Sequence, residues 1–377
     1  MSNSIYFPPG DGTWETIVPE KAGLDPAAIK AAKTFALDHE STMDRDIGRA
    51  LATGHFSEPM PDGEIIGPTR PRGDPSGLIL KRGRIVAEWG PTDAPDMTFS
   101  VTKSYLSICA GLAVDDGLIP DIDAPCRLLV DDLFDHPQNR TITWRHLLHQ
   151  TSEWEGTLWG KADRIDRNRK LDVPPNTPSL KGTHRDLQAP GAFWEYNDIR
   201  VNVLSTALMR VFRRSLPDVL RERIMQPIGA SDTWTWNGYR NSTLVVDGES
   251  LQAVSGGAHW GGGLFISARD HARVGLMMLN EGTWNGQQLI GRDWIRASTT
   301  PCPLNPDYGF LWWLNGRGAQ SPSASPESYF ALGVGRNAIW IDPKNDLVVV
   351  LRWIERDALD GFTEALAVDC VPAAAGA

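Results

Sequence analysis

Long apolar runs, blocks of basic residues and regularly spaced cysteines are all missing from this sequence of 377 residues. No apolar run is as long as the roughly 18 residues that a membrane-spanning helix needs. The chain has 37 Lys+Arg against 47 Asp+Glu, and its formal net charge is −10. Nucleic-acid binding requires clustered Lys and Arg, and an anionic membrane repels an acidic surface. We therefore expect neither a nucleic acid nor a membrane as a partner.

Signals for export and for metal binding are also missing. The first residues have neither the positive nor the apolar region of a signal peptide. The four cysteines follow no disulfide or metal spacing, and the eight histidines form no metal motif. We expect a reduced, cytoplasmic protein that uses no metal and no other cofactor. The sequence carries no signal for the oligomeric state, and a homodimer is a guess.

Patterns typical of strands occur toward both ends of the chain, and helical patterns lie outside them. The predicted strands are residues 77–81, 84–89, 308–314, 337–342 and 347–353, and the predicted outer helices are 26–38 and 357–371. Residues 40–75 have the composition of irregular surface, and the middle of the chain favours helix and loop. This order predicts an α+β fold, in which an antiparallel sheet built from both ends is flanked by the terminal helices.

A mostly helical subdomain is expected to be inserted into this sheet domain. We place the sheet domain at residues 1–104 plus 250–377 and the helical subdomain at 105–249. The active site is expected in the cleft between the two.

Ser100 and Lys103 are the first candidates for chemistry. They precede and begin a helical pattern that continues through Tyr105, Leu106, Cys109 and Leu112. Residues three apart share one face of a helix, so the Lys103 amine can reach the Ser100 hydroxyl. A serine beside a base at a helix N-terminus is an activated nucleophile, and the unpaired N–H groups there favour an oxyanion. A capping serine with a surface lysine is the structural alternative.

Three further segments follow in the order of a known signature. They are Tyr196-Asn197-Asp198, Trp260 to Asp270 with its glycine-rich start, and Trp340 to Val350. Together with Ser-x-x-Lys, the chain from about residue 76 resembles the class C β-lactamase-like serine hydrolases, which have the penicillin-recognising serine enzyme fold. The group includes family VIII carboxylesterases, D-Ala-D-Ala peptidases and the 6-aminohexanoate-oligomer hydrolase.

The resemblance implies an acyl-enzyme mechanism on Ser100. Tyr196, helped by Lys103, would take the Ser100 proton and pass it to the leaving group. The family's Lys-Thr-Gly motif aligns with Ala331-Leu332-Gly333, so only Gly333 is kept. Backbone N–H groups of Ser100 and Val334 would form the oxyanion hole, which needs no particular side chain. Arg336 could supply the positive charge that the missing lysine no longer provides.

Asp198 is the other departure, because the family motif is Tyr-x-Asn. A carboxylate beside Lys103 is expected to raise the pKa of the lysine, which would shift the role of base toward a Tyr196 phenolate. Asp198 is also a candidate N-cap for a helix over 199–212, and the two roles are compatible.

The sequence is rich in tryptophan, with 15 residues. Trp89, Trp312, Trp313, Trp340 and Trp353 fall in predicted strands and are interpreted as core or sheet face. The expected pocket wall consists of Trp154, Trp159, Trp194 and Trp260, which border the site in the family, as do Gly261 and His259. Such a wall favours an apolar or aromatic group in the substrate, although a structural role is the stronger expectation for His259.

We therefore expect a serine hydrolase that cleaves small ester or amide substrates. A β-lactamase or D-aminoacyl peptidase activity and a non-catalytic binding homologue remain as alternatives. An α/β-hydrolase is disfavoured, because residues 253–257 only approach Gly-x-Ser-x-Gly and no suitable Asp and His follow.

Overall fold

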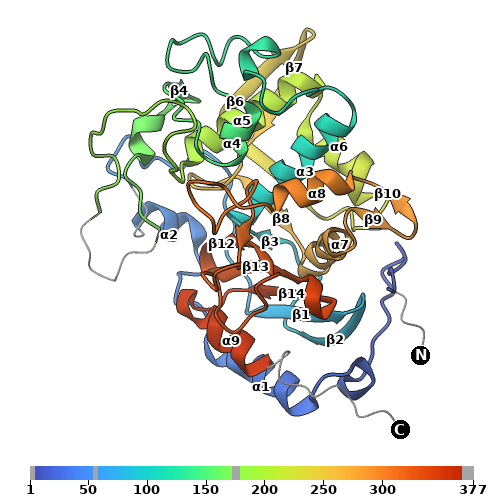
Figure 1. The fold of residues 1–377 in the computed structure, drawn as a ribbon. Helices are drawn as coiled ribbons and strands as arrows, with labels where there is room; N and C mark the ends of the chain where they lie inside the picture. Colours follow the sequence, from blue (N-terminus) through green and yellow to red (C-terminus); the bar gives the residue numbers. More distant parts are fainter. Residues whose placement is uncertain (1–4, 54–57, 172–178, 367–377) are drawn as a thin grey trace.

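The computed structural model describes residues 5–53, 58–171 and 179–366. Over these ranges the chain forms a six-stranded sheet and a four-stranded sheet, with helices packed around them (Figure 1). The helices are α1 Pro26–Asp38, α2 Ile47–Thr53, α3 Val101–Asp115, α4 Trp144–Leu148, α5 Asp198–Phe212, α6 Leu216–Leu220, α7 Ala268–Leu279, α8 Arg292–Ser298 and α9 Leu359–Leu366.

The strands of the larger sheet lie in the order β11-β12-β13-β14-β1-β2. They are β1 Ser76–Lys81, β2 Arg84–Trp89, β11 Trp313–Leu314, β12 Tyr329–Gly333, β13 Asn337–Asp342 and β14 Leu347–Arg352. Every neighbouring pair is antiparallel, and Ile79 of β1 lies opposite Val349 of β14. The predicted antiparallel sheet built from both ends of the chain is therefore confirmed.

The smaller sheet has the order β3-β8-β6-β7. Its strands are β3 Asp96–Met97, β6 Thr235–Val246, β7 Glu249–Val254 and β8 Gly263–Ile266. The short pairs β4 Thr157–Leu158 with β5 Lys161–Ala162 and β9 Thr283–Trp284 with β10 Gln287–Gln288 form separate hairpins. Since β3 ends just before Ser100, this sheet fixes the segment that leads into α3.

Side chains of the larger sheet alternate between two apolar layers. In β14, Val348 and Val350 belong to the main core, whereas Leu347, Val349 and Leu351 belong to a second core on the opposite face. Successive residues of a strand point to opposite faces, so a strand covered on both sides is an unbroken apolar run. This burial accounts for the continuous Leu-Val-Val-Val-Leu segment of β14.

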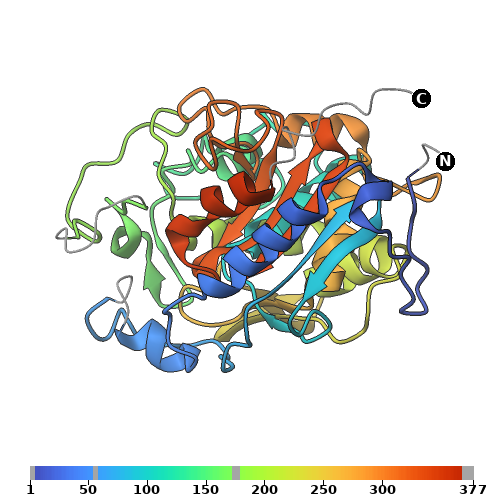
Figure 2. The ribbon, with the colours of Figure 1, turned by 90° about the horizontal axis from the view of Figure 1, so that it is seen from below.

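The terminal helices cover the second of these faces. Figure 2 shows α1 and α9 side by side across the sheet, and Leu359 and Phe362 of α9 pack in the same core as Ile29 of α1. Helix α1 begins as predicted, with the Asp25 side chain accepting a hydrogen bond from Ala27 N. Helix α7 packs on the other face against β1, β13 and β14. Each face of the sheet is thus closed by at least one helix.

Several expectations about local structure need correction. The predicted strand 308–314 is a turn up to residue 312, with Leu311 at a φ of 60°, and only β11 pairs with the sheet. The supposedly irregular segment 40–75 contains α2. The predicted helix 357–371 ends its described part at Leu366, and residues 367–371 lie outside the described ranges.

The predicted domain boundaries fall inside secondary-structure elements and not in linkers between them. The boundary at 104/105 falls inside α3, and that at 249/250 falls in the β6–β7 hairpin. The division into a sheet domain and a helical subdomain therefore stays a prediction. Among the described residues, none of the helices has the length and apolar character needed to cross a membrane.

We expect Leu78→Ala to lower the free energy of unfolding by about 2–5 kcal/mol, because Leu78 of β1 is fully buried in the main core. Urea denaturation followed by tryptophan fluorescence measures this loss. Leu128→Ala is the matched control, since Leu128 is 67% exposed and should leave the midpoint nearly unchanged. Equal midpoints for both variants would contradict this account of the core.

Candidate active site

Ser100 lies at the N-terminus of α3, immediately after a strained residue. Phe99 has a φ of 50°, which a bulky side chain rarely adopts, and its ring packs edge-on against Trp353. Ser100 occupies the N-cap position, but its side chain makes no capping hydrogen bond. Its Oγ instead accepts a hydrogen bond of 2.9 Å from Lys103 Nζ. The serine hydroxyl is thus held by the lysine and not by the helix backbone.

Lys103 is buried, with 2% of its side chain exposed. Helix α3 is enclosed along most of its length, so an ammonium on it needs a partner from another element. Asp198 provides that partner, and the Lys103 Nζ to Asp198 Oδ1 distance is 2.5 Å. The structure therefore brings the Ser-x-x-Lys segment and the Tyr-x-Asp segment together.

The Tyr196-Asn197-Asp198 segment leads directly into α5. Asn197 is the N-cap of this helix, because its side chain accepts a hydrogen bond from Arg200 N. Asp198 is the first helical residue, so the suggestion that Asp198 caps the helix is wrong. With the capping role taken by its neighbour, the Asp198 carboxylate is directed to Lys103.

Tyr196 completes a cluster around Ser100. It borders the same cavity as Ser100, and Lys103 Nζ lies 4.7 Å from the centre of its ring. Tyr196 is buried, at 3% exposure, between the protein core and the cavity. The serine, the lysine and the tyrosine thus form one enclosed cluster.

Burial controls the protonation of this cluster. It lowers the pKa of Lys103, and the Asp198 carboxylate offsets only part of that effect. Burial, with the Asp198 charge, raises the pKa of Tyr196 well above its usual range. For Asp198, burial is outweighed by the charges of Lys103 and Arg169, which hold the pKa of the carboxyl well below its usual range.

These directions correct the expectation drawn from the sequence. Asp198 does not raise the pKa of Lys103 above its ordinary value, because the loss of hydration has the larger effect. A resting Tyr196 phenolate is also disfavoured. The lysine is consequently the more readily deprotonated partner of Ser100.

The end of β12 lies against the nucleophile. A Cβ placed on Gly333 would come within 3.2 Å of Ser100 N and would collide with the Thr98 carbonyl. Only glycine allows this close approach, which explains why Gly333 is kept while Ala331 and Leu332 differ from the family motif. Ser100 and Val334 both line the cavity at this approach. The oxyanion hole formed by their two N–H groups stays a prediction.

Ser100 opens into a cavity of about 1070 Å³. The predicted site residues that line it are Ser100, Trp194, Tyr196, Asp198, His259, Trp260, Gly333, Val334 and Arg336. Lys103 lies beneath this surface and reaches it through Ser100 and Asp198.

Trp154, Trp159 and Gly261 are not among the described residues that border the cavity. Trp154 donates a hydrogen bond to the Leu133 carbonyl inside the core, and Trp159 packs edge-on against Tyr239. Gly261 has a φ of 84° and lies against the backbone of Gly67. All three serve the packing around the site, so the pocket wall expected from four tryptophans keeps only Trp194 and Trp260.

Trp313 lines the cavity, although its strand position indicated core or sheet face. Its ring stacks on that of Tyr196 at 5.8 Å between centroids, and Trp194 meets it at 69°. Tyr308 closes this group from behind and receives a hydrogen bond from Gln150, which also accepts one from Asn197 N. β11 is a short strand at the edge of the sheet, so one face of Trp313 stays open to the cavity. A sequence pattern does not show which face of an edge strand is left open.

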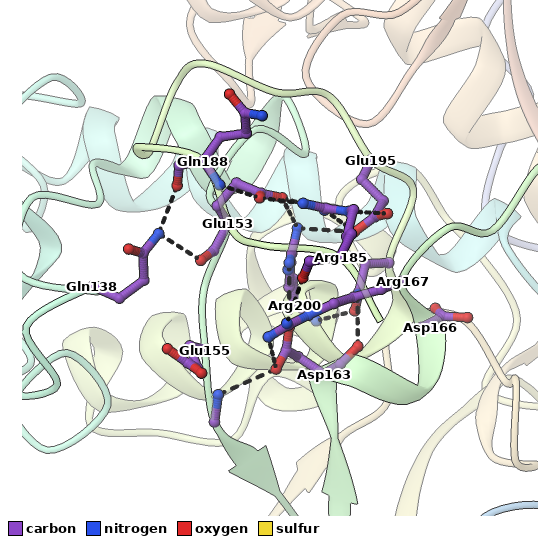
Figure 3. Close-up of polar contacts among 12 residues, drawn as sticks. Gln138, Glu153, Glu155, Asp163, Asp166, Arg167, Arg185, Gln188, Glu195 and Arg200 are labelled. Carbon is purple, nitrogen blue, oxygen red and sulfur yellow. Dashed lines mark hydrogen bonds and ion pairs between the residues drawn. The ribbon is translucent and has the colours of Figure 1, made fainter. Parts of the chain in front are cut away.

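Buried ion pairs hold the approach to α5 in place. Arg200, on the first turn of α5, contacts Glu153 at 2.7 Å and Asp163 at 3.2 Å (Figure 3). Arg185 joins Glu153 to Glu195, the residue before Tyr196. Removing one member of such a buried network leaves an uncompensated charge. The network therefore fixes the position of Tyr196 and Asp198.

A second charged cluster adjoins Asp198 and was missed from the sequence. Among the described residues, Glu58, Asp166 and His259 place their ligand atoms within 4.8 Å of one another, a spacing that could hold a metal ion. Lys181 Nζ contacts Glu58, lies 3.2 Å from Asp166 and lies 3.0 Å from His259 Nε2. The lysine ammonium thus provides the positive charge among these three groups.

Arg169 extends this cluster to Asp198. Its Nη1 lies 2.5 Å from Asp198 Oδ2 and 3.2 Å from Asp166. The density of charge in residues 161–170 is the only sequence signal for these residues, and it gives no indication of which charges are buried.

Comparison with known proteins agrees with this geometry. The family model described as Beta-lactamase matches residues 78–354, which is most of the chain. The protein belongs to the β-lactamase family. The family resemblance and the fold class predicted from the sequence are thereby confirmed, and the β-lactamase-related members matched here include hydrolases of several kinds.

One curated relative is the 6-aminohexanoate-dimer hydrolase of Paenarthrobacter ureafaciens. It is 24% identical over 302 residues, which cover 72% of this chain and 70% of the relative. The solved structure of EstCE1, a hydrolase with promiscuous acyltransferase activity, matches with a TM-score of 0.56 at 15% identity, over 92% of this chain and 98% of the other. A D-stereospecific amidohydrolase from Streptomyces sp. matches with a TM-score of 0.52 at 16% identity, over 79% and 94%. At these identities the structures show a shared fold.

We expect Gly257→Ala to lower kcat by at least about 10-fold, because displacing catalytic groups by even 1 Å can cost about 100-fold. A Cβ at this position would collide with Asp198 Oδ1 and with Lys103 Nζ. Steady-state hydrolysis of a chromogenic ester, with thermal unfolding measured alongside, tests this. Gly316→Ala is the control, since nothing lies within 4 Å of its Cβ. Wild-type activity in Gly257→Ala would show that the Lys103–Asp198 contact tolerates displacement.

Proposed function

We propose that this protein is a serine hydrolase that cleaves small ester or amide substrates through an acyl-enzyme on Ser100. The observation that carries the proposal is the buried Lys103 amine, 2.9 Å from Ser100 Oγ at the edge of a large cavity. Burying a lysine is costly, and a lysine whose pKa is lowered in this way is a suitable base for a serine.

In the proposed acylation step, Ser100 Oγ forms a bond to the substrate carbonyl carbon while its proton passes to the neutral Lys103 amine. The carbonyl oxygen becomes an oxyanion, and the N–H groups of Ser100 and Val334 donate hydrogen bonds to it. The positive end of the α3 dipole favours the same negative charge.

Collapse of the tetrahedral intermediate breaks the bond to the leaving group, which takes a proton from the Tyr196 phenol. The Lys103 ammonium then returns its proton to Tyr196. In deacylation, water gives a proton to the same pair as its oxygen bonds to the acyl carbon, and a second tetrahedral intermediate forms. Collapse of this intermediate breaks the bond to Ser100 Oγ, which takes that proton back, so that the carboxylic acid is released and Ser100 is regenerated. Tyr196 thus begins and ends the reaction as a neutral phenol and relays protons, whereas Lys103 acts as the base.

The lining of the cavity supports small substrates with an apolar part. Leu332 stands beside the proposed oxyanion hole where the family motif has threonine, and Ala331 replaces its lysine. Trp194 and Trp313 present flat apolar surfaces next to Tyr196. This supports esters and linear amides over substrates that need a lysine for their carboxylate. The name of the 6-aminohexanoate-dimer hydrolase relative adds a linear amide to the candidates.

Ser100→Ala should abolish hydrolysis of p-nitrophenyl acyl esters and labelling by a fluorophosphonate, because both require the Ser100 hydroxyl as nucleophile. A parallel screen with aminohexanoate oligomers and nitrocefin separates linear amides from β-lactams. Ser104→Ala is the matched control, since the Ser104 hydroxyl donates to the Leu311 carbonyl inside the core. Equal ester hydrolysis by wild type and Ser100→Ala would refute the nucleophile.

Tyr196→Phe should lower turnover by about 100-fold or more, because the variant keeps the ring and its packing but lacks the proton that the leaving group needs. The effect should be larger for amides than for p-nitrophenyl esters, whose leaving group departs without a proton. Tyr6→Phe, outside the cavity, controls for the loss of a tyrosine hydroxyl. Near-normal amide turnover in Tyr196→Phe would remove Tyr196 from the mechanism.

A further inference from the structure

The Asp198 carboxylate is shared between two buried cations. Its Oδ1 contacts Lys103 Nζ at 2.5 Å, and its Oδ2 contacts Arg169 Nη1 at 2.5 Å. The exposed side-chain fractions are 2% for Lys103, 3% for Asp198 and 6% for Arg169, so water screens none of these contacts appreciably. The ion pair beside Ser100 is therefore a group of three charges with a net charge of +1.

Arg169 is itself held in a fixed position. It contacts Asp166, whose carboxylate also accepts a hydrogen bond of 2.6 Å from Asp198 N at the start of α5. Its guanidinium lies 5.3 Å from the centre of the Tyr196 ring, and Lys103 Nζ lies 4.7 Å from the same ring. Arg169 thus contacts both Tyr196 and Asp198 of the Tyr-x-Asp segment.

Other charged groups surround this unit and are mutually paired. His259 Nδ1 lies 3.6 Å from Asp198 Oδ2, and His259 Nε2 lies 2.7 Å from Glu58. Lys181 joins Glu58 to Asp166. Among the charges that act on Lys103, Asp198 has the largest effect, followed by Arg169 and then Asp166.

We propose that Arg169 is a positioning residue for the Ser100–Lys103 pair. Arg169 holds the second oxygen of Asp198 and balances the charge of this carboxylate, so that Asp198 orients Lys103 without fixing it as an ammonium. This inference rests on the proposed function. A carboxylate alone at 2.5 Å would favour the charged lysine, which is a poor base. The guanidinium is always protonated, so its opposing charge is present at every working pH.

The opposite charges of Asp198 and Arg169 explain how an aspartate can replace the asparagine of the family's Tyr-x-Asn motif. Asp198 contributes −1 and Arg169 contributes +1, so the pair is neutral overall, and Arg169 offsets part of the larger effect that the nearer Asp198 has on Lys103. Burial and the Arg169 charge both lower the pKa of Lys103, in agreement with this balance. Replacing Asp198 and Arg169 together is then expected to leave the protonation of Lys103 nearly unchanged, whereas replacing either residue alone should change it.

The test is the pH dependence of kcat/KM for a p-nitrophenyl ester in Arg169→Met, Asp198→Asn and the double variant. In the wild type, we expect kcat/KM to rise with pH as Lys103 loses its proton. Arg169→Met removes a positive charge, so the rise should move to higher pH, with about a 10-fold loss of kcat/KM at neutral pH. Asp198→Asn should move the rise to lower pH, and the double variant should return it toward that of the wild type.

Two further variants separate this role from a structural one. Arg169→Lys keeps the charge and should keep the wild-type pH midpoint. Arg167→Met, two residues before Arg169, breaks a buried ion pair with Asp163 and should lower thermal stability without moving the midpoint. If Arg169→Met alone does not fold, the pH midpoints of three other variants can be compared: Asp198→Asn, Asp198→Asn/Arg169→Lys and Asp198→Asn/Arg169→Met. Their differences still show whether a positive charge at position 169 moves the midpoint to lower pH.

The rate of fluorophosphonate labelling at each pH provides a second readout of Ser100 that is independent of substrate binding. A uniform loss of kcat/KM at every pH in Arg169→Met, or a double variant no better than the single ones, would overturn the role of Arg169. Unchanged hydrolysis in Ser100→Ala would instead overturn the proposed function. The two failures are thus distinguishable in one set of variants.

Discussion

A lysine ammonium buried in the first turn of α3 is the constraint on which the rest of the site depends. Hydration cannot stabilise the charge of Lys103 there, so a carboxylate must be supplied by another element. Asp198 supplies it from α5, which makes the packing of α3 against α5 a condition for the chemistry. The same burial lowers the pKa of Lys103 and thereby makes the residue useful as a base.

The surrounding ion pairs follow from this first burial. Asp198 is balanced by Arg169, Arg169 by Asp166, and Asp166 by Lys181. Arg200 and Glu153 secure the start of α5 from the opposite direction (Figure 3). Breaking one buried pair typically costs about 3–5 kcal/mol, because the remaining charge loses its partner. Such networks add little net stability when complete, but they leave each charged group a single well-defined position.

The sheets contribute the backbone side of the site. Gly333 ends β12 directly beside Ser100 N, and the segment from β3 to α3 places Phe99 in a strained conformation that orients the serine. These contacts join strands that are distant in sequence, since β12 and α3 are separated by more than half of the chain. The geometry of the proposed oxyanion hole is therefore a property of the complete sheet and of no single segment.

Local spacing in the sequence determined the elements that carry the chemistry. Ser100 and Lys103 are one helical turn apart, the unbroken apolar run in residues 347–351 marks a strand covered on both faces, and Asp25 caps α1. The tertiary structure alone decided which distant groups meet: Arg169 with Asp198, Trp313 with Tyr196, and Glu58 with Lys181 and His259. It also decided the direction of the Lys103 pKa, because a neighbouring carboxylate can be read from a motif but the loss of hydration cannot. Burial is a sum over long-range contacts, and those contacts exist only once the chain has folded.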